Sequence, residues 1–179
     1  MAGIHVSVPT LQTILTSCKH TILQVENNCA NAELVRQFIA LHSDIKLVTS
    51  INGLHGYEMA QSLQPDMILL DMRVSCANGL DVFALLREDV LTAHIPVIIL
   101  SSNAFLGEGK KCLDAGAFGY LTKPYKLKDL MEVIVVALRH AKAHRSVAEI
   151  AFTPAAMTVV EQCLSRQPPS LGEGGHIHL

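Results

Sequence analysis

The sequence predicts an α/β fold in which helices cover both faces of a parallel sheet. Short runs of large apolar residues recur along the chain, such as Met67 to Leu70. Runs of this kind are typical of strands that are buried on both faces. Stretches with helical spacing separate these runs, so that a strand and a helix alternate five times over about 120 residues. This alternation is the pattern of a doubly wound domain.

Each element has its own justification. The first helix shows 3.6-residue spacing of its apolar positions, and Pro65 prevents the second helix from continuing. Pro96 is tolerated at the start of a strand, whereas Gly107 and Gly109 weaken the fourth helix by about 1 kcal/mol each relative to Ala. The expected strands are 21–26, 45–49, 67–70, 95–100 and 117–121, and the expected helices are 32–41, 56–63, 79–87, 104–115 and 127 to about 144.

The domain organisation follows from where these patterns begin and end. Residues 1–20 carry no strong pattern and form an N-terminal extension, and residues 21–144 form the domain. Residues 145–179 form a C-terminal extension. Its first part predicts a helix over 154–166, because Pro is favoured at a helix start. The tail that follows is rich in Pro, Gly and Ser, which is typical of disorder.

Polar side chains follow four of the predicted strands. Glu26 ends the first strand, Asp71 follows the third, Ser101 follows the fourth and Lys123 follows the fifth. In doubly wound sheets the chemistry lies just beyond the carboxyl ends of the strands. Two carboxylates, a hydroxyl and an ammonium group at one sheet edge predict a site for a divalent cation and a phosphoryl group.

Composition excludes several classes of function. Net charge is −2 and Trp is absent, and no basic stripe with interleaved aromatics indicates nucleic-acid binding. The five cysteines (18, 29, 76, 112 and 163) are odd in number and form no Cys-x-x-Cys motif, which favours a reducing cytoplasm over a disulfide framework or zinc site.

Two further segments concern export and membranes. No apolar run approaches the roughly 20 residues of a membrane span. The sequence from Leu15 to Cys18 matches a lipoprotein cleavage box, but no basic residue precedes it, and a signal peptide requires one.

Five segments, in order and at compatible spacing, carry a resemblance to a known family. The chain resembles the receiver domain of two-component response regulators, of the single-domain, chemotaxis-regulator-like type, from about residue 21 to 140. The five segments are ILQVENN (22–28), PDMILLDM (65–72), NGL (78–80), IPVIILSS (95–102) and AGAFGYLTKP (115–124).

The resemblance implies a fold and a set of roles. The fold is the flavodoxin-like five-stranded sheet of order 2-1-3-4-5. Asp71 matches the phosphoacceptor, and the implied partner is a histidine kinase or a phosphotransfer protein. Mg²⁺ is the implied cofactor. The remaining implied positions are Glu26 and the backbone carbonyl of Arg73 as metal ligands, Ser101 as the hydroxyl that moves toward the phosphoryl group, Lys123 as the conserved-type amine, a cis peptide bond before Pro124, and Tyr120 as the aromatic switch.

The main departure from the family pattern is Asn27, which stands where an Asp is usual. An amide oxygen offers no negative charge, so Asn27 binds Mg²⁺ weakly or through water. Two alternatives remain open: a working receiver with weaker metal affinity, and a degenerate receiver that acts as a phosphorylation-independent interaction module. Ser75 also replaces a frequent Pro. No output domain is recognisable after the last helix, so we expect protein contact as the output.

Three alternative interpretations concern enzymes, metals and the last helix. The enzyme class is disfavoured, because Asp71 ends the third strand with Arg73 two residues later, unlike the haloacid dehalogenase type, and no glycine-rich phosphate loop follows the first strand. His140 and His144 have metal-ligand spacing, but no third ligand is in register. The last helix is apolar on more than one face, which predicts either a C-terminal segment folded back over it or a homodimer.

Overall fold

The computed structural model describes residues 19–75, 78–102 and 108–151, with the backbone alone described for residues 144–151. The chain divides into two compact units, Met1–Lys142 and Ala143–Leu179. Within the described residues the second unit consists of the last turns of one helix. The fold and the candidate site therefore belong to the first unit.

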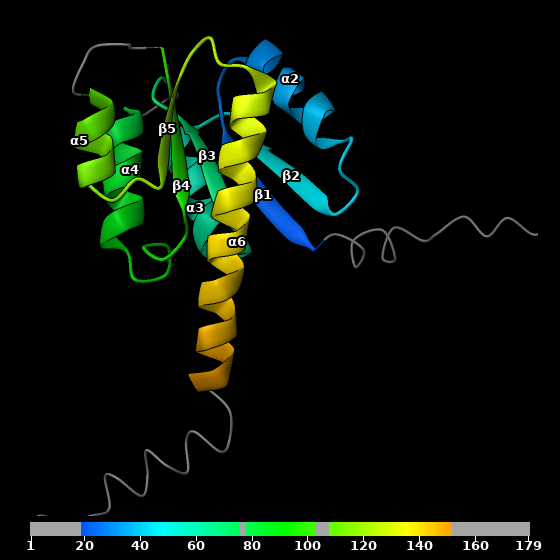
Figure 1. The fold of residues 1–179 in the computed structure, drawn as a ribbon. Coiled ribbons are helices and arrows are strands. Elements are labelled where there is room, and N and C mark those ends of the chain that lie inside the picture. Colours follow the sequence, from blue (N-terminus) through cyan, green and yellow to red (C-terminus); the bar gives the residue numbers. More distant parts are fainter. Residues whose placement is uncertain (1–18, 76–77, 103–107, 152–179) are drawn as a thin grey trace, which may run out of the picture. The chain divides into compact units, whose positions relative to one another are not determined.

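A five-stranded parallel sheet forms the centre of the first unit (Figure 1). The strand order is β2-β1-β3-β4-β5, which confirms the predicted order 2-1-3-4-5 and the flavodoxin-like fold class. The central strand β3 and its neighbour β4 are buried at every position, as expected for strands that are covered on both faces. The strands are β1 (His20–Val25), β2 (Ile45–Ser50), β3 (Met67–Asp71), β4 (Val97–Ser101) and β5 (Gly119–Thr122).

Helices cover both faces of this sheet. The helices α2 and α6 cover one face, where Val35 and Leu130 belong to the same buried cluster as Ile22 of β1. The helices α3, α4 and α5 cover the other face, where Phe83 and Cys112 pack with Leu23. The helices are α2 (Cys29–Ile39), α3 (Gly53–Leu63), α4 (Gly79–Glu88), α5 (Glu108–Asp114) and α6 (Leu127–Ala151).

Two helices begin three residues earlier than the apolar pattern indicated. The Asn28 side chain accepts hydrogen bonds from the backbone N–H groups of Ala30 and Asn31, so α2 begins at Cys29 instead of residue 32. Asn52 caps α3 in the same way, and α3 begins at Gly53 instead of residue 56. Asn is among the preferred N-cap residues because its oxygen satisfies N–H groups that the first turn leaves unpaired.

The last two strands, by contrast, begin two residues later than the apolar pattern indicates. Pro96 has no N–H group and the N–H of Ile95 donates to Thr92 O, so β4 begins at Val97. The N–H of Ala117 donates to Cys112 O at the end of α5, and β5 begins at Gly119. Both N–H groups are used by the preceding turn and cannot join the strand ladder.

The last helix is longer than expected. It continues to Ala151 instead of ending near residue 144, because no Gly or Pro interrupts residues 127–151. The predicted helix over 154–166, the tail after it and residues 1–18 of the N-terminal extension lie outside the described residues. The division of the chain into an N-terminal extension, a domain and a C-terminal extension stays a prediction.

Candidate functional site at the carboxyl edge of the sheet

The strand register brings the predicted polar residues to one edge of the sheet. In the ladder, Val25 lies beside Leu70, Asp71 lies beside Leu100, and Ser101 lies beside Thr122. The residues that follow these positions, Glu26 and Lys123, therefore reach the same edge as Asp71 and Ser101. All strands are parallel, so this common edge is a consequence of the βα repeat itself.

Lys123 joins the two carboxylates of this edge. Its Nζ atom lies 2.6 Å from Glu26 Oε2 and 2.6 Å from Asp71 Oδ2. The side chains of Glu26 and Asp71 are 1% and 5% exposed, and that of Lys123 is 15% exposed. The Lys123–Pro124 peptide bond is cis, in line with the resemblance. One cation thus pairs with two buried acids, which lie 97 and 52 residues away from it in the sequence.

The second oxygen of each acid accepts a backbone hydrogen bond. Glu26 Oε1 accepts from the N–H of Asn28 at 3.0 Å, and Asp71 Oδ1 accepts from the N–H of Arg73 at 3.0 Å. Each carboxylate is therefore held by one ammonium contact and one main-chain contact. This geometry fixes both side chains before any ligand binds.

The two acids titrate differently. Burial raises the pKa of Glu26 above its ordinary value, and the nearby Asp71 adds to the rise, although Lys123 opposes it. Burial acts on Asp71 in the same direction, but the hydrogen bonds from Lys123 and from the Arg73 N–H outweigh it and lower the pKa of Asp71. Burial also acts to lower the pKa of Lys123, but its two carboxylate partners outweigh that effect and raise it. The contacts from Lys123 and the Arg73 N–H therefore favour the ionised form of Asp71.

The oxygen atoms at this edge suit a hard cation in type but offer little charge. Asn27 is exposed beside Glu26 and contributes no carboxylate. Within residues 19–75, 78–102 and 108–143, no group of three or more His, Cys, Asp or Glu side chains could hold a metal ion. Mg²⁺ takes oxygen ligands and keeps several waters, so one or two carboxylates can suffice. The donor set fits Mg²⁺ in chemistry, with one charge fewer than three acids would give.

Ser101 and Tyr120 lie next to each other on neighbouring strands. Ser101 is buried at the end of β4, and Tyr120 is half-buried in β5. The Tyr120 hydroxyl donates to Glu108 Oε2 at 3.3 Å. Burial raises the pKa of Tyr120 and the carboxylate of Glu108 adds to the rise, while the Ser101 hydroxyl opposes it through a hydrogen bond. The tyrosine is therefore linked to both α5 and the end of β4.

Two glycines make close approaches that sequence reasoning missed. A Cβ atom on Gly79 would lie 2.5 Å from Met72 Cα and 2.7 Å from Asp71 O, so only glycine lets α4 start against the strand end that carries Asp71. A Cβ atom on Gly109 would lie 3.0 Å from Tyr120 Cδ1. In the sequence Gly109 indicates only a weak helix former, and the contact partner of a glycine has no signal in the sequence.

Arg73 makes a side-chain contact that the sequence pattern does not indicate. The Arg73 guanidinium donates to Ser102 Oγ at 2.7 Å, which ties the loop after β3 to the end of β4. Its backbone N–H, as described above, holds Asp71. Charged residues just after a strand end are the signal that could have suggested such links, but the partner depends on the rotamer.

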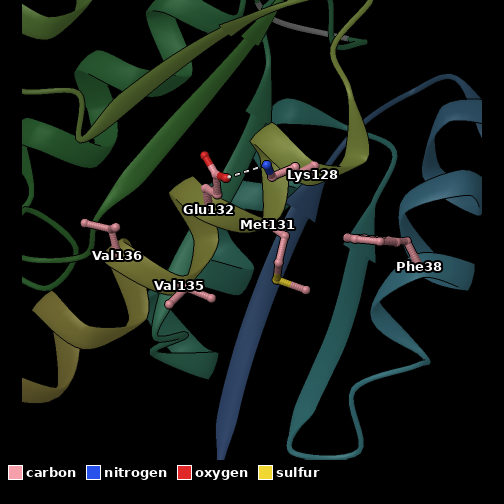
Figure 2. Close-up of a pocket in the computed structure, with 6 residues that line it drawn as sticks. All are labelled: Phe38, Lys128, Met131, Glu132, Val135 and Val136. Atoms are coloured by element: carbon pink, nitrogen blue, oxygen red, sulfur yellow. Dashed lines mark ion pairs between the residues drawn. The ribbon is translucent and has the colours of Figure 1, made fainter.

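A separate apolar groove lies between α2 and α6. It has a volume of about 630 Å³. Figure 2 shows Phe38 of α2 facing Met131 of α6, with Val135 and Val136 one turn further along α6. Lys128 and Glu132 form an ion pair at its rim, with 3.7 Å between Nζ and Oε1. The groove belongs to the helical face of the domain and contains none of the site residues described above.

The remaining sequence expectations have simple outcomes. His140 packs against the Phe118 ring with 5.1 Å between ring centroids, and the side chain of His144 lies outside the described residues. Cys29 and Cys112 are free thiols, one exposed and one buried; cysteines 18, 76 and 163 lie outside the described residues. Among the described residues, no helix is long and apolar enough to cross a membrane.

Comparison with known proteins decides the family. Residues 22–135 match the family described as the response regulator receiver domain. The chain belongs to the receiver-domain family of two-component response regulators. The resemblance seen in the five sequence segments is thereby confirmed.

Individual relatives show how much of each protein this receiver chain spans. It is 36% identical over 135 residues to the nitrate/nitrite response regulator NarL of Escherichia coli (strain K12), and the aligned region covers 75% of this chain and 60% of NarL. It is 31% identical over 114 residues to the polar-differentiation response regulator DivK of Brucella anthropi, with 64% of this chain and 92% of DivK covered. The receiver chain thus spans little more than half of NarL and nearly all of DivK.

A solved structure gives the same result at the level of the fold. The receiver domain of sensor histidine kinase PA1611 from Pseudomonas aeruginosa superimposes with a TM-score of 0.60 at 26% identity, covering 70% of this chain and 99% of that one. That structure is described as having a magnesium ion coordinated in its active-site cleft.

Proposed function

We propose that this receiver accepts a phosphoryl group on Asp71 from a phosphohistidine of a histidine kinase or phosphotransfer protein. The observation that supports it most is the double contact of Lys123 with Asp71 and Glu26 at 2.6 Å. This contact orients Asp71 in a nearly buried site and lowers the pKa of its carboxyl group, which favours the ionised form. A carboxylate must be ionised to attack phosphorus, and its own charge must be screened from that of the incoming group.

The proposed transfer is a simple displacement. An oxygen of Asp71 forms a bond to phosphorus while the phosphorus–nitrogen bond of the phosphohistidine breaks, and the electron pair of the broken bond stays with the imidazole. Lys123 remains beside the acceptor as a compact positive charge. The Arg73 N–H, which donates to Asp71 Oδ1, keeps the carboxylate in place during the approach.

The proposed Mg²⁺ ligands are Glu26, Asp71 and the backbone carbonyl of Arg73, with Asn27 as a weak or water-mediated ligand. Bound Mg²⁺ would supply positive charge between the acceptor carboxylate and the phosphoryl oxygens. The donor chemistry at this edge and the magnesium of the PA1611 receiver domain support this proposal. The neutral Asn27 predicts weaker binding than a receiver with an Asp at that position.

The proposed response is a shift of the Ser101–Tyr120 pair. The phosphoryl group on Asp71 attracts the Ser101 hydroxyl. Ser101 is close by, because it follows Leu100, the residue of β4 that lies beside Asp71 in the sheet. Ser101 now contributes a hydrogen bond to Tyr120, so its movement changes the environment of the tyrosine ring. A surface built from β5 and α5 then differs between the two states, which is the local event that such switches use.

The test is phosphorylation of the full chain by acetyl phosphate with Mg²⁺, read by intact mass. We expect a gain of one phosphoryl group, lost in Asp71→Asn and retained in the control Asp114→Asn, which removes an exposed carboxylate of α5. A gain that persists in Asp71→Asn would refute the assignment.

A second function has a specific observation in its favour. Asn27 leaves the site with two carboxylates, and Lys123 already occupies both. A receiver of this kind can act as an interaction module without phosphorylation. No mass gain at high Mg²⁺ concentration, with the fold intact by circular dichroism, would favour this alternative.

We further propose that the domain is not itself an enzyme and that it works in the cytoplasm by protein contact, without nucleic-acid binding. The absence of a basic stripe in the sequence and the free thiols support this. Relatives include the DNA-binding regulator RpaA of Synechocystis and the protein-glutamate methylesterase/protein-glutamine glutaminase of Bacillus subtilis, of which this chain covers 48% and 45%.

A further inference from the structure

The outer face of α6 and the neighbouring edge of α2 present apolar side chains that the domain does not cover. Val135 and Val136 are 36% and 55% exposed, and both line a groove together with Phe38 of α2. The groove of about 630 Å³ between Phe38 and Met131 lies in the same face. Contiguous exposed apolar surface that is rimmed by polar groups marks an interaction site.

We propose that a second copy of this chain occupies this face, with the two α6 helices packed antiparallel about a two-fold axis between Val135 and Val136. In a two-fold interface the same patch meets itself, so it must carry both partners of every contact. About this axis Val135 and Val136 of one copy lie opposite Val136 and Val135 of the other, and both residues line the groove.

The charges of α6 also match this arrangement. Glu132 and Arg139 are both exposed and lie seven residues apart, so they share a face of the helix. They are equally far from the proposed axis on either side. Antiparallel packing therefore places Glu132 opposite Arg139 of the second copy, twice per dimer.

Parallel packing would instead place Glu132 against Glu132 and Arg139 against Arg139, and like charges in such positions are destabilising. Lys128 does not remove this distinction. It pairs with Glu132 within the helix at 3.7 Å, but the Glu132 side chain remains 66% exposed. The carboxylate can therefore accept a second cationic partner at the rim.

This dimer goes beyond the proposed phosphoryl transfer and does not rest on it, since the face contains none of the proposed site residues. Its test is the association state of the full chain by sedimentation equilibrium, at protein concentrations of about 1–100 µM. We expect a dimer for the unmodified chain. Glu132→Arg and Arg139→Glu should each weaken it by about tenfold, because each turns two attractive contacts into two repulsive ones.

The decisive sample is the double variant Glu132→Arg/Arg139→Glu, which restores opposite charges across the antiparallel interface and should recover the dimer to within about twofold. The control Lys110→Glu reverses an exposed charge on α5 and should leave the association unchanged. Val136→Asp should give a monomer with an unchanged circular dichroism spectrum.

Three results would overturn the proposal. The first is a monomer at every concentration, including one that binds a phosphotransfer protein through this face. The second is a double variant that associates no better than the single variants, because this excludes antiparallel pairing. The third is a dimer that Val136→Asp leaves intact, because a different face then forms it.

Discussion

Replacement of Lys123 by Met tests the structure of the site independently of its function. Met keeps most of the length of the side chain and removes the ammonium group that lies 2.6 Å from both Glu26 and Asp71. Two acids that are at most 5% exposed then face each other without a counter-charge. Removal of one partner from a buried ion pair costs about 3–5 kcal/mol.

The loss of stability expected for Lys123→Met lies toward the lower end of this range. Lys123 is 15% exposed, so water screens part of the interaction, and one acid can take up a proton. We therefore expect a loss of about 2–4 kcal/mol in the free energy of unfolding at neutral pH. For a chain of this size this corresponds to a fall in melting temperature of roughly 5–15 °C.

The measurement is urea denaturation of the full chain in the presence of a chelator, so that metal binding does not contribute. The matched control is Lys128→Met, which removes an ammonium group whose side chain is 84% exposed and lies 3.7 Å from Glu132. Exposed pairs of this kind are worth less than about 0.5 kcal/mol.

A second variant separates repulsion from lost packing. Glu26→Gln in the Lys123→Met background removes one of the two facing charges and should recover part of the stability, whereas Glu26→Gln alone should destabilise the protein. A loss for Lys123→Met no larger than that for Lys128→Met would refute the reasoning, because the Lys123 ammonium group would then not be offsetting the charge of the buried acids.

Three further outcomes are expected. Gly109→Ala should displace the Tyr120 ring, since the added Cβ would lie 3.0 Å from Cδ1; unchanged aromatic chemical shifts of Tyr120 would contradict this. The pKa of Asp89 is lowered, mainly by the Leu91 N–H and then by Gln61 and Tyr57, so its stabilisation is present above pH 3.8 and is lost as the pH falls through the folded-state pKa. The melting temperature of Asp89→Asn should accordingly lie below that of the unmodified chain at pH 6 and approach it at about pH 3; a gap that does not narrow would contradict this. Asn27→Asp should tighten Mg²⁺ binding by about tenfold or more through the added charge, measured by calorimetric titration, and an unchanged affinity would show that the amide is not the cause of weak binding.

The fold could be predicted because it depends on local patterns. Apolar runs such as residues 67–70 can be buried on both faces only in a covered parallel sheet. Parallel strands joined by helices then have their carboxyl ends at one edge. Glu26, Asp71, Ser101 and Lys123 could be assigned to that edge before any distance was known.

The ends of elements were less predictable, for an equally local reason. Asn28 and Asn52 cap their helices ahead of the first apolar position, so the apolar pattern alone places those starts too late. Ile95 and Ala117 lose their N–H groups to preceding turns, which shortens two strands. Hydrogen-bond partners of single backbone groups set these ends, and the hydrophobic period does not report them.

By itself, the sequence determined the sheet, the helices and the residue types at the candidate site, including the neutral Asn27 in place of an acid. Only the tertiary structure decided that Lys123 bridges both carboxylates and that α6 has an uncovered apolar face. It also decided that Gly79 lies against the backbone of Asp71 and Met72, and that Gly109 lies against the Tyr120 ring. These features depend on distances and rotamers between elements many residues apart. Close packing of the whole domain fixes such distances, and no short stretch of residues encodes them.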